Sequence, residues 1–319
     1  LRVERELSSG AALAACLAYG APWPTLSDQL RHFCDDFSLE TQPLFRLPFF
    51  ETEINGERLR FIHARSAERR APPLLLLHGY SAALAEFQSL VEPLSRSFHV
   101  ICPSLPGFGF SDGAPCPRAA AAACGALMQR LGYERYLVHG SDLGATIALE
   151  LGAQRAAEVA GLHVTSVAAY PAADEGLTSH EKSQLARLTE LRDELRFHLP
   201  ESPSEELAFA LSRLDDEASS AHQQLLNTLW TGLTLTCAWG DAPARRELYR
   251  YSLRTAPSCK APLSLHAFPL AAPSLRRFAE RRQHVVKWQE HPHGGCMPAL
   301  EQPDTLLDTL RSFGQSSAS

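Results

Sequence analysis

Two short apolar runs, each closed by the dipeptide His-Gly, restrict the fold of this chain more than any other feature. They are Pro73–Leu77 and Tyr136–Val138. Unbroken apolar runs of this length between turn signals are typical of strands that are buried on both faces of a parallel sheet. A third run, Phe98–Cys102, lies between them and ends in a loop rich in proline and glycine.

Segments with the apolar spacing of helices separate these strands, at Glu86–Leu94 and Ala119–Leu131. The alternation of strand and helix predicts a doubly wound, mostly parallel sheet of the α/β class. Three further strands and a closing helix are expected at Val159–Val167, Leu263–Phe268, His284–Trp288 and Pro303–Phe313.

The chain divides into three parts by its pattern. Residues 66–170 and 255–319 carry the α/β core. Residues 171–254 contain charged helical stretches, Ser179–Phe197 and Ser204–Leu214, and no evident strand, so they are expected to form a helical cap inserted over the sheet. Residues 1–65 form a lead-in segment with a hairpin turned at Asn55-Gly56.

Composition excludes several classes of function. A net charge of -6 argues against nucleic-acid binding, which needs a basic surplus. Neither an apolar run near twenty residues nor an export signal is evident, so we expect no membrane span and a cytoplasmic location. The eight cysteines and thirteen histidines are dispersed without metal-ligand spacing, and we expect neither a metal nor a cofactor.

The turn after the second apolar run carries the best candidate for chemistry. A nucleophile on a tight strand-to-helix turn needs small residues two positions before and two positions after it. Centred on Asp142 these positions are Gly140 and Gly144, whereas centred on Ser141 they are bulky. Asp142 is therefore the candidate nucleophile. The alternative is an Asp that only caps the following helix.

The loop that contains His78, Gly79 and Tyr80 follows the first apolar run, at the sheet edge where α/β proteins bind ligands. The backbone N–H groups of Tyr80 and Leu143 are expected to converge on the spare oxygen of an Asp142 ester, as in an oxyanion hole. His78 is expected to support this loop and to take no part in the reaction.

Several motifs together resemble those of one enzyme family. They are Leu47–Thr52 and Phe61–His63 in the lead-in, Leu75–Tyr80, Pro103–Ser111, Leu131–Tyr136, Gly140–Gly144, and Trp288 with Gly294–Pro303. With these motifs the chain resembles an α/β-hydrolase of the epoxide hydrolase family, of the microsomal or juvenile-hormone type. The resemblance covers most of residues 40–170 and 260–313 and is thin in the cap.

The resemblance implies a two-step reaction. Asp142 would open an epoxide to give a covalent ester while cap tyrosines hydrogen-bond the epoxide oxygen, and a histidine oriented by an acid would then activate water. Tyr249 matches one tyrosine, with Tyr251 as a nearby substitute. Phe197 falls where the other is expected and cannot donate that hydrogen bond. Trp230 is a candidate for the wall of an apolar substrate cavity, or else it packs in an ordinary core.

The water-activating pair of that family is missing from this sequence. The histidine position holds Cys296, and the acid position, just after Phe268-Pro269, holds Leu270 or Ala271. An unperturbed thiol has a pKa of about 8.5 and is a poor base at neutral pH. His293, on the same loop, is a candidate replacement, and the alternative is that it only occupies the surface.

We therefore expect an enzyme that opens an epoxide, or a similar electrophile, of an apolar small molecule through Asp142, with cyclisation or isomerisation as the outcome. The alternatives are a true epoxide hydrolase that uses His293 as base, and a non-catalytic protein that binds small molecules. An ester hydrolase that uses Cys296 as nucleophile ranks last.

Overall fold

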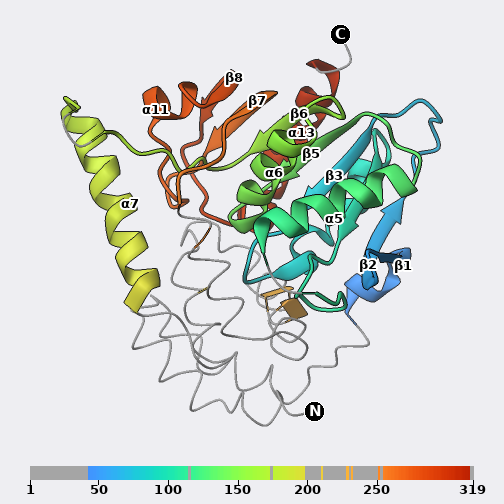
Figure 1. Cartoon of the computed structure of the whole chain (residues 1–319). Coiled ribbons are helices and arrows are strands. Elements are labelled where there is room, and N and C mark those ends of the chain that lie inside the picture. Colours follow the sequence, from blue (N-terminus) through green and yellow to red (C-terminus); the bar gives the residue numbers. More distant parts are fainter. Residues whose placement is uncertain are drawn as a thin grey trace.

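The computed structural model describes residues 42–113, 116–172, 175–197, 210, 228–229, 231–232, 251 and 254–316, with side chains to residue 193 in the segment that ends at 197. These residues form an eight-stranded sheet with helices on both faces (Figure 1). The strands are β1 Phe49–Ile54, β2 Glu57–Ala64, β3 Pro73–Leu77, β4 His99–Pro103, β5 Tyr136–Gly140, β6 Val159–Val164, β7 Cys259–Ala267 and β8 Gln283–Glu290. The helices are η2 Pro43–Arg46, η3 Ala83–Phe87, α4 Val91–Ser95, α5 Pro117–Arg130, α6 Leu143–Gln154, α7 Ser179–Phe197, α11 Arg276–Glu280, α12 Pro298–Glu301 and α13 Pro303–Ser316.

The order of the strands, β1-β2-β4-β3-β5-β6-β7-β8, confirms the doubly wound α/β sheet. From β4 to β8 every neighbouring pair is parallel, whereas β1 pairs with β2, and β2 with β4, in antiparallel orientation. Asn55 and Gly56 turn that hairpin with φ values of 55° and 84°, the left-handed conformation that an Asn-Gly turn requires. The hairpin expected from the sequence is thus confirmed.

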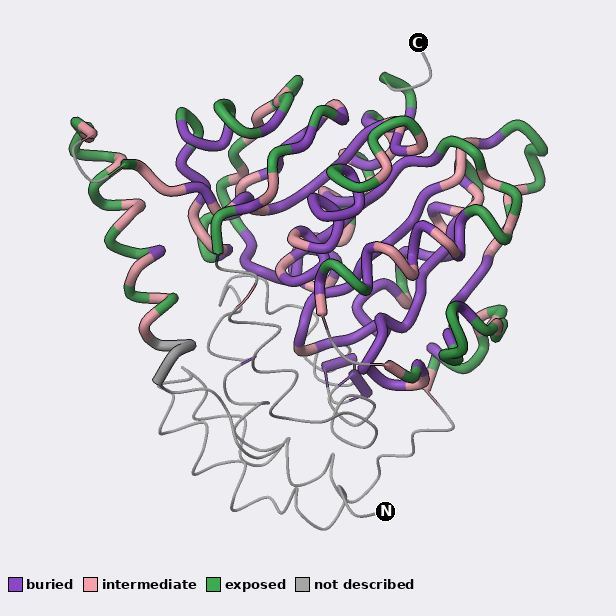
Figure 2. The backbone as a smooth tube through the Cα atoms, in the orientation of Figure 1, coloured by how far each residue is buried: buried purple, intermediate pink, exposed green. Residues whose placement is uncertain are grey.

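The hydrophobic core has two layers, one on each face of the sheet. Helices α5 and α6 cover one face, and η3, α4 and α13 cover the other. The central strand β5 is buried along its whole length, and β3, β4 and β6 are buried at all but one residue each, as the mostly purple tube in Figure 2 shows. Burial on both faces explains why these strands are apolar without alternation.

Several elements end a few residues away from their expected bounds, and two of these differences have consequences for the fold. The segment Glu86–Leu94, expected as one helix, is divided between η3 and α4. Pro93 explains the break, because proline has no N–H and its ring clashes with the carbonyl four residues earlier, yet it fits the first turn of α4. The strand expected at Val159–Val167 ends earlier, at Val164, where the chain leaves the sheet toward the candidate site.

The helix expected at Ser179–Phe197 is present with those bounds as α7. Of the second expected cap helix, Ser204–Leu214, only Ala210 belongs to the described residues. The division of the chain into lead-in, core and cap therefore stays a prediction. In the described part of the chain, none of the helices combines the length and apolar character that crossing a bilayer requires.

Candidate active site

Asp142 occupies the turn between β5 and α6 with a strained backbone. Its φ of 49° and ψ of -118° lie in a region that residues other than glycine rarely adopt. Such strain persists only where the surrounding structure enforces it, and it concentrates at functional sites. The turn thus presents one carboxylate at the edge of the sheet.

Gly140 and Gly144 are sterically required at this turn. A Cβ atom on Gly140 would overlap the backbone carbonyl of Gly144, and one on Gly144 would overlap the carbonyl of Leu77. Both overlaps are with backbone atoms, which cannot move aside as a flexible side chain can. The spacing of small residues around Asp142 therefore has the physical cause inferred from the sequence.

The loop after β3 reaches the Asp142 side chain. Strands β3 and β5 are neighbours, and Leu77 at the end of one pairs with Gly140 at the end of the other. The backbone N–H of Tyr80 consequently donates a hydrogen bond of 3.0 Å to Oδ2 of Asp142. Leu143 begins α6, so its N–H is among the first four of the helix, which have no partner within the helix. The two N–H groups expected at the oxyanion position thus lie on segments that flank Asp142.

His78 is fully buried and connects the loop after β3 to the loop after β4. The N–H of Leu105 donates to Nε2 of His78 across 3.1 Å, so Nδ1 carries the ring proton and donates to the carbonyl of Gly79 across 2.7 Å. Burial lowers the pKa of His78 to about 4. A neutral ring with both nitrogens engaged supports the loop, as expected from the sequence.

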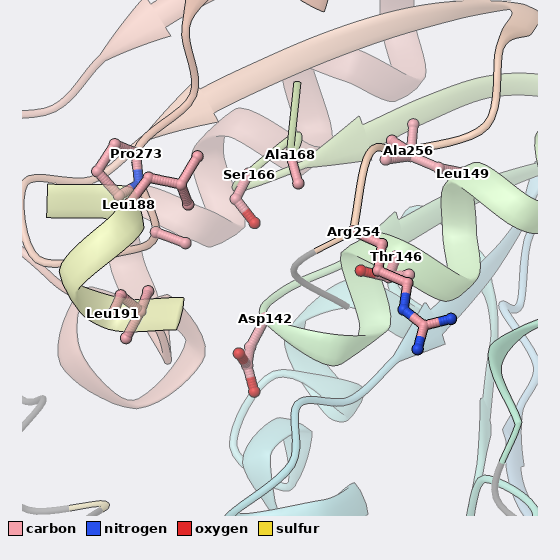
Figure 3. Close-up of a pocket in the computed structure, with 11 residues that line it drawn as sticks. Asp142, Thr146, Leu149, Ser166, Ala168, Leu188, Leu191, Arg254, Ala256 and Pro273 are labelled. Atoms are coloured by element: carbon pink, nitrogen blue, oxygen red, sulfur yellow. The ribbon is translucent and has the colours of Figure 1, made fainter. Parts of the chain in front are cut away.

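Asp142 lines a cavity between the sheet edge and α7 (Figure 3). Its described lining also includes the hydroxyls of Thr146 and Ser166, the guanidinium of Arg254 and the apolar side chains Leu149, Ala168, Leu188, Leu191, Ala256, Ala272 and Pro273. Within this described lining there is no histidine. The carboxylate therefore faces a mostly apolar space.

The two positions at which the sequence predicts the loss of an acid and a base lie on loops that contact each other. The N–H of Leu270 donates to the carbonyl of Gly294 across 3.2 Å, which joins the loop after β7 to the loop that bears Cys296. Cys296 is buried, Ala271 is buried and Leu270 is 43% exposed. At these positions the chain carries a thiol and two alkyl groups, so the absence of the acid and the base stays a prediction.

The remaining residues expected at the site are placed as follows. His293 is exposed and does not belong to the described cavity lining, so its role as a base stays a prediction. The Tyr251 hydroxyl donates to Oε1 of Glu150 on α6 across 3.1 Å, and burial raises its pKa. Tyr249, Trp230 and the side chain of Phe197 lie outside the described residues.

Glu86 is a buried residue at this site that sequence reasoning missed. It lies on η3 with no exposed surface, and it accepts hydrogen bonds from the N–H of Gly79 at 2.7 Å and from the hydroxyl of Ser141 at 2.5 Å. Burial raises its pKa to about 8. A single acid in a segment with helical spacing reads as solvent-exposed, so the sequence offers no signal of this burial.

Sequence reasoning also missed a row of four histidines that crosses the sheet. His139 on β5, His163 on β6, His266 on β7 and His291 after β8 follow one another across the sheet. Nδ1 of His139 lies 3.1 Å from Nδ1 of His163, the rings of His163 and His266 stack at 4.2 Å, and Nδ1 of His266 lies 3.0 Å from Nε2 of His291. Dispersed in sequence, they become adjacent only through the strand order.

Two family models match the chain. The model described as alpha/beta hydrolase fold matches residues 72–242, more than half of the chain. The model described as epoxide hydrolase N terminus matches residues 2–87, which include the lead-in segment. The core thus matches the alpha/beta hydrolase fold, and the lead-in is similar to the N-terminal segment of epoxide hydrolases.

Relatives and solved structures agree with these matches. A protein of Stigmatella aurantiaca that carries the name of an epoxide hydrolase is 28% identical over 84% of this chain and 70% of its own length. The juvenile hormone epoxide hydrolase of Bombyx mori is 34% identical over 46% of this chain, and the match spans only 35% of that protein. The epoxide hydrolase structure from Aspergillus niger has a TM-score of 0.71 at 24% identity, and the match covers 92% of this chain and 84% of that one, which shows a shared fold.

Proposed function

This chain belongs to the alpha/beta hydrolase fold family, and from that premise we propose that it opens the epoxide of an apolar small molecule through Asp142. The observation that supports this most is the Asp142 carboxylate itself. It stands on a strained turn, accepts the N–H of Tyr80 and faces a mostly apolar cavity. The likeness to epoxide hydrolases along the chain supports the choice of electrophile.

We propose that the product is a cyclised or isomerised molecule and not a diol. Hydrolysis of an Asp142 ester needs a base with a pKa near the working pH, held by a second group. Cys296, Leu270 and Ala271 occupy the family positions for that pair and supply neither an imidazole nor a carboxylate. An intramolecular attack does not require activated water.

The proposed reaction balances without any other reactant. Asp142 removes the proton from a hydroxyl of the substrate, and the hydroxyl oxygen attacks an epoxide carbon. The epoxide carbon–oxygen bond breaks, its electron pair goes to the epoxide oxygen, and the proton returns to that oxygen from Asp142. Substrate and product are isomers. The apolar walls at Leu188 and Leu191 would hold the substrate in the folded conformer that this attack needs.

Hydrolysis with His293 as base is the second candidate. One feature of the structure favours it: His293 stands on the loop that bears Cys296, next to Gly294, whose carbonyl binds the N–H of Leu270. If this exposed side chain moved toward the cavity, its imidazole could act as the base that activates water. The candidates differ in whether oxygen from water enters the product.

The test is incubation with epoxides, with and without a hydroxyl group within reach of the ring, in water that carries heavy oxygen. An unlabelled isomer formed by the wild-type protein and not by Asp142→Asn supports the proposal. A labelled diol indicates hydrolysis, and His293→Gln then tests the base. A lasting mass increase on Asp142 indicates a stalled ester. Consumption that is equal in the wild-type protein and in Asp142→Asn, or no consumption, contradicts the proposal and favours a binding protein.

A further inference from the structure

Two carboxylates bind consecutive N–H groups of the same loop. Gly79 N–H donates to Oε2 of Glu86, and the next N–H along the chain, that of Tyr80, donates to Oδ2 of Asp142. Oε2 of Glu86 and Oδ2 of Asp142 each lie 3.3 Å from the position that a Cβ atom on Gly79 would take. The candidate nucleophile and a second acid therefore lie beside the same residue, Gly79.

Glu86 also holds the turn that carries Asp142. The hydroxyl of Ser141, the residue before Asp142, lies 2.5 Å from Oε1 of Glu86, a short distance for a hydrogen bond between oxygens. One side chain thus binds both segments that must meet if Tyr80 N–H is to reach Asp142. Glu86 itself is fully buried and has no exposed surface, so it acts through these contacts and not by touching substrate.

The surroundings favour the neutral acid. Among described residues, the titratable groups that face Glu86 are Asp142 from the turn, Glu301 from α12 and the Cys102 thiol from β4. None of them supplies a positive charge, and burial of an unpaired carboxylate is costly. Burial, with these neighbouring acids, raises the pKa of Glu86 to about 8.

The hydrogen bonds engage both carboxyl oxygens of Glu86. Oε2 accepts the N–H of Gly79, and Oε1 accepts the hydroxyl of Ser141. A protonated carboxyl group can accept both bonds, because each of its oxygens keeps acceptor capacity. Ionisation would strengthen the pull on Gly79, because hydrogen bonds to charged groups are roughly twice as strong, and it would set two anions beside one residue, Gly79.

We propose that Glu86 is a positioning residue that, as a neutral carboxylic acid, locks the Gly79-Tyr80 loop to Ser141 and thereby aims the N–H of Tyr80 at Asp142. Loss of its proton would push the two carboxylates apart and weaken the bond between Tyr80 and Asp142. The expected effect of Glu86 on the reaction rests on the proposed function. The expected effect of Glu86 on the Tyr80 amide rests only on the geometry of the hydrogen bonds.

The first test follows the Tyr80 amide by NMR and needs no substrate. In protein labelled with ¹⁵N-tyrosine, seven amide signals are expected, and the one absent from Tyr80→Phe is that of Tyr80. We expect this signal to shift between pH 6.5 and about 9 in the wild-type protein. In Glu86→Gln, which preserves one accepting and one donating group, it should stay constant. A signal that does not titrate in the wild-type protein, or that still titrates in Glu86→Gln, overturns the proposal.

The second test follows, against pH, the rate at which 4,5-epoxypentan-1-ol is consumed, an epoxide whose own hydroxyl can reach the ring. We expect the wild-type rate to fall above pH 8, the Glu86→Gln rate to equal it near pH 7 and to persist at higher pH, and the Glu86→Leu rate to be reduced at least about tenfold throughout. Glu92→Gln, at an exposed position on α4, is the matched control and should keep the wild-type profile. An alkaline decline that remains in Glu86→Gln contradicts the proposal.

The two tests separate the two proposals. If no variant consumes epoxide but the Tyr80 amide titrates through Glu86, the proposed function fails and the positioning role stands. If epoxide is consumed but neither the amide nor the rate responds to Glu86→Gln as expected, the positioning role fails alone. Thermal unfolding of each variant, measured at pH 7, shows whether a variant that has lost activity is still folded.

Discussion

The backbone N–H of Tyr80 donates a hydrogen bond to Oδ2 of Asp142 across 3.0 Å, which joins the loop after β3 to the turn after β5. These segments are 62 residues apart in sequence, and the parallel pairing of β3 with β5 brings them together. This hydrogen bond fixes the carboxylate of a residue that lines the cavity. The relationship supports a reaction in which Asp142 attacks or accepts a proton.

Replacement of Asp142 by Asn tests that role directly. The amide keeps the size of the side chain and tolerates the positive φ, but it is neither a nucleophile nor a base of useful strength. We expect epoxide consumption to fall at least about a thousandfold with little change in melting temperature. Asp112→Asn, at a half-exposed surface ion pair with Arg58, is the control and should leave the rate unchanged. Equal rates for the wild-type protein and Asp142→Asn would exclude a catalytic role for this carboxylate.

Restoring the missing pair should restore the second step. Cys296→His with Leu270→Asp places an imidazole and a carboxylate on two loops that are already joined by the bond from Leu270 N–H to Gly294. Position 270 is 43% exposed and can hold a carboxylate, whereas Ala271 is buried and would penalise the charge. We expect the double variant to form a diol that carries one heavy oxygen from labelled water.

The single variant Cys296→His is the control for the orienting acid. Without Asp at position 270 its imidazole is not held in one tautomer, and diol formation should be at least about tenfold slower than in the double variant. If the double variant opens the epoxide and still releases no labelled diol, the assignment of positions 270 and 296 to the family's pair is wrong.

The core could be predicted from sequence because its signals are local. The strands follow from apolar runs, the hairpin from Asn55-Gly56, and the turn at Asp142 from glycines two positions away on each side. Each of these depends on sterics within a few residues, so the pattern carries the structure. Pro93, a local breaker, divides one predicted helix, and the ends of several other predicted elements, among them β6 and β7, were wrong by a few residues.

The features that were missed depend on contacts between distant segments. Glu86 is buried because Gly79 and Ser141 meet over it, and the hydroxyl of Ser141 comes from 55 residues away. His139, His163 and His266 become neighbours because β5, β6 and β7 are adjacent in the sheet. Neither spacing nor composition records this adjacency, which arises only when the sheet is assembled.

The steric argument for the turn predicts a large loss of stability for Gly144→Ala. The added methyl group would overlap the carbonyl of Leu77, and neither backbone segment can move without disturbing the sheet. We expect a loss of about 3 kcal/mol or more in the free energy of unfolding, measured with urea. Gly176→Ala, where nothing lies within 4 Å of the added atom, should change stability by less than about 1 kcal/mol. Similar losses at the two positions would contradict the argument.

The histidine row predicts a steep loss of stability in acid. Burial lowers the pKa of His139 to about 4 and that of His266 to about 3, and it lowers the pKa values of His163 and His291 as well. In the unfolded chain these histidines bind protons near pH 6.5, whereas in the folded chain they stay neutral to lower pH. Their contribution to the free energy of unfolding is therefore fully present above pH 6.5. It is lost as the pH falls from 6.5 toward the folded pKa values, on the order of 3 kcal/mol for His139 alone.

Glu86 acts on stability in the opposite sense, so the two groups together set the optimum pH. Its folded pKa of about 8 exceeds the unfolded value of 4.5, and the stability it favours is complete below 4.5 and is lost as the pH rises to 8. Urea unfolding from pH 4.5 to 8.5 should therefore show a maximum near pH 6.5. His139→Gln should flatten the acid side and Glu86→Gln the alkaline side, while His284→Gln, at an exposed position on β8, should alter neither. A wild-type profile that is flat below pH 6.5 would show that the row is protonated without penalty and is not buried as the fold places it.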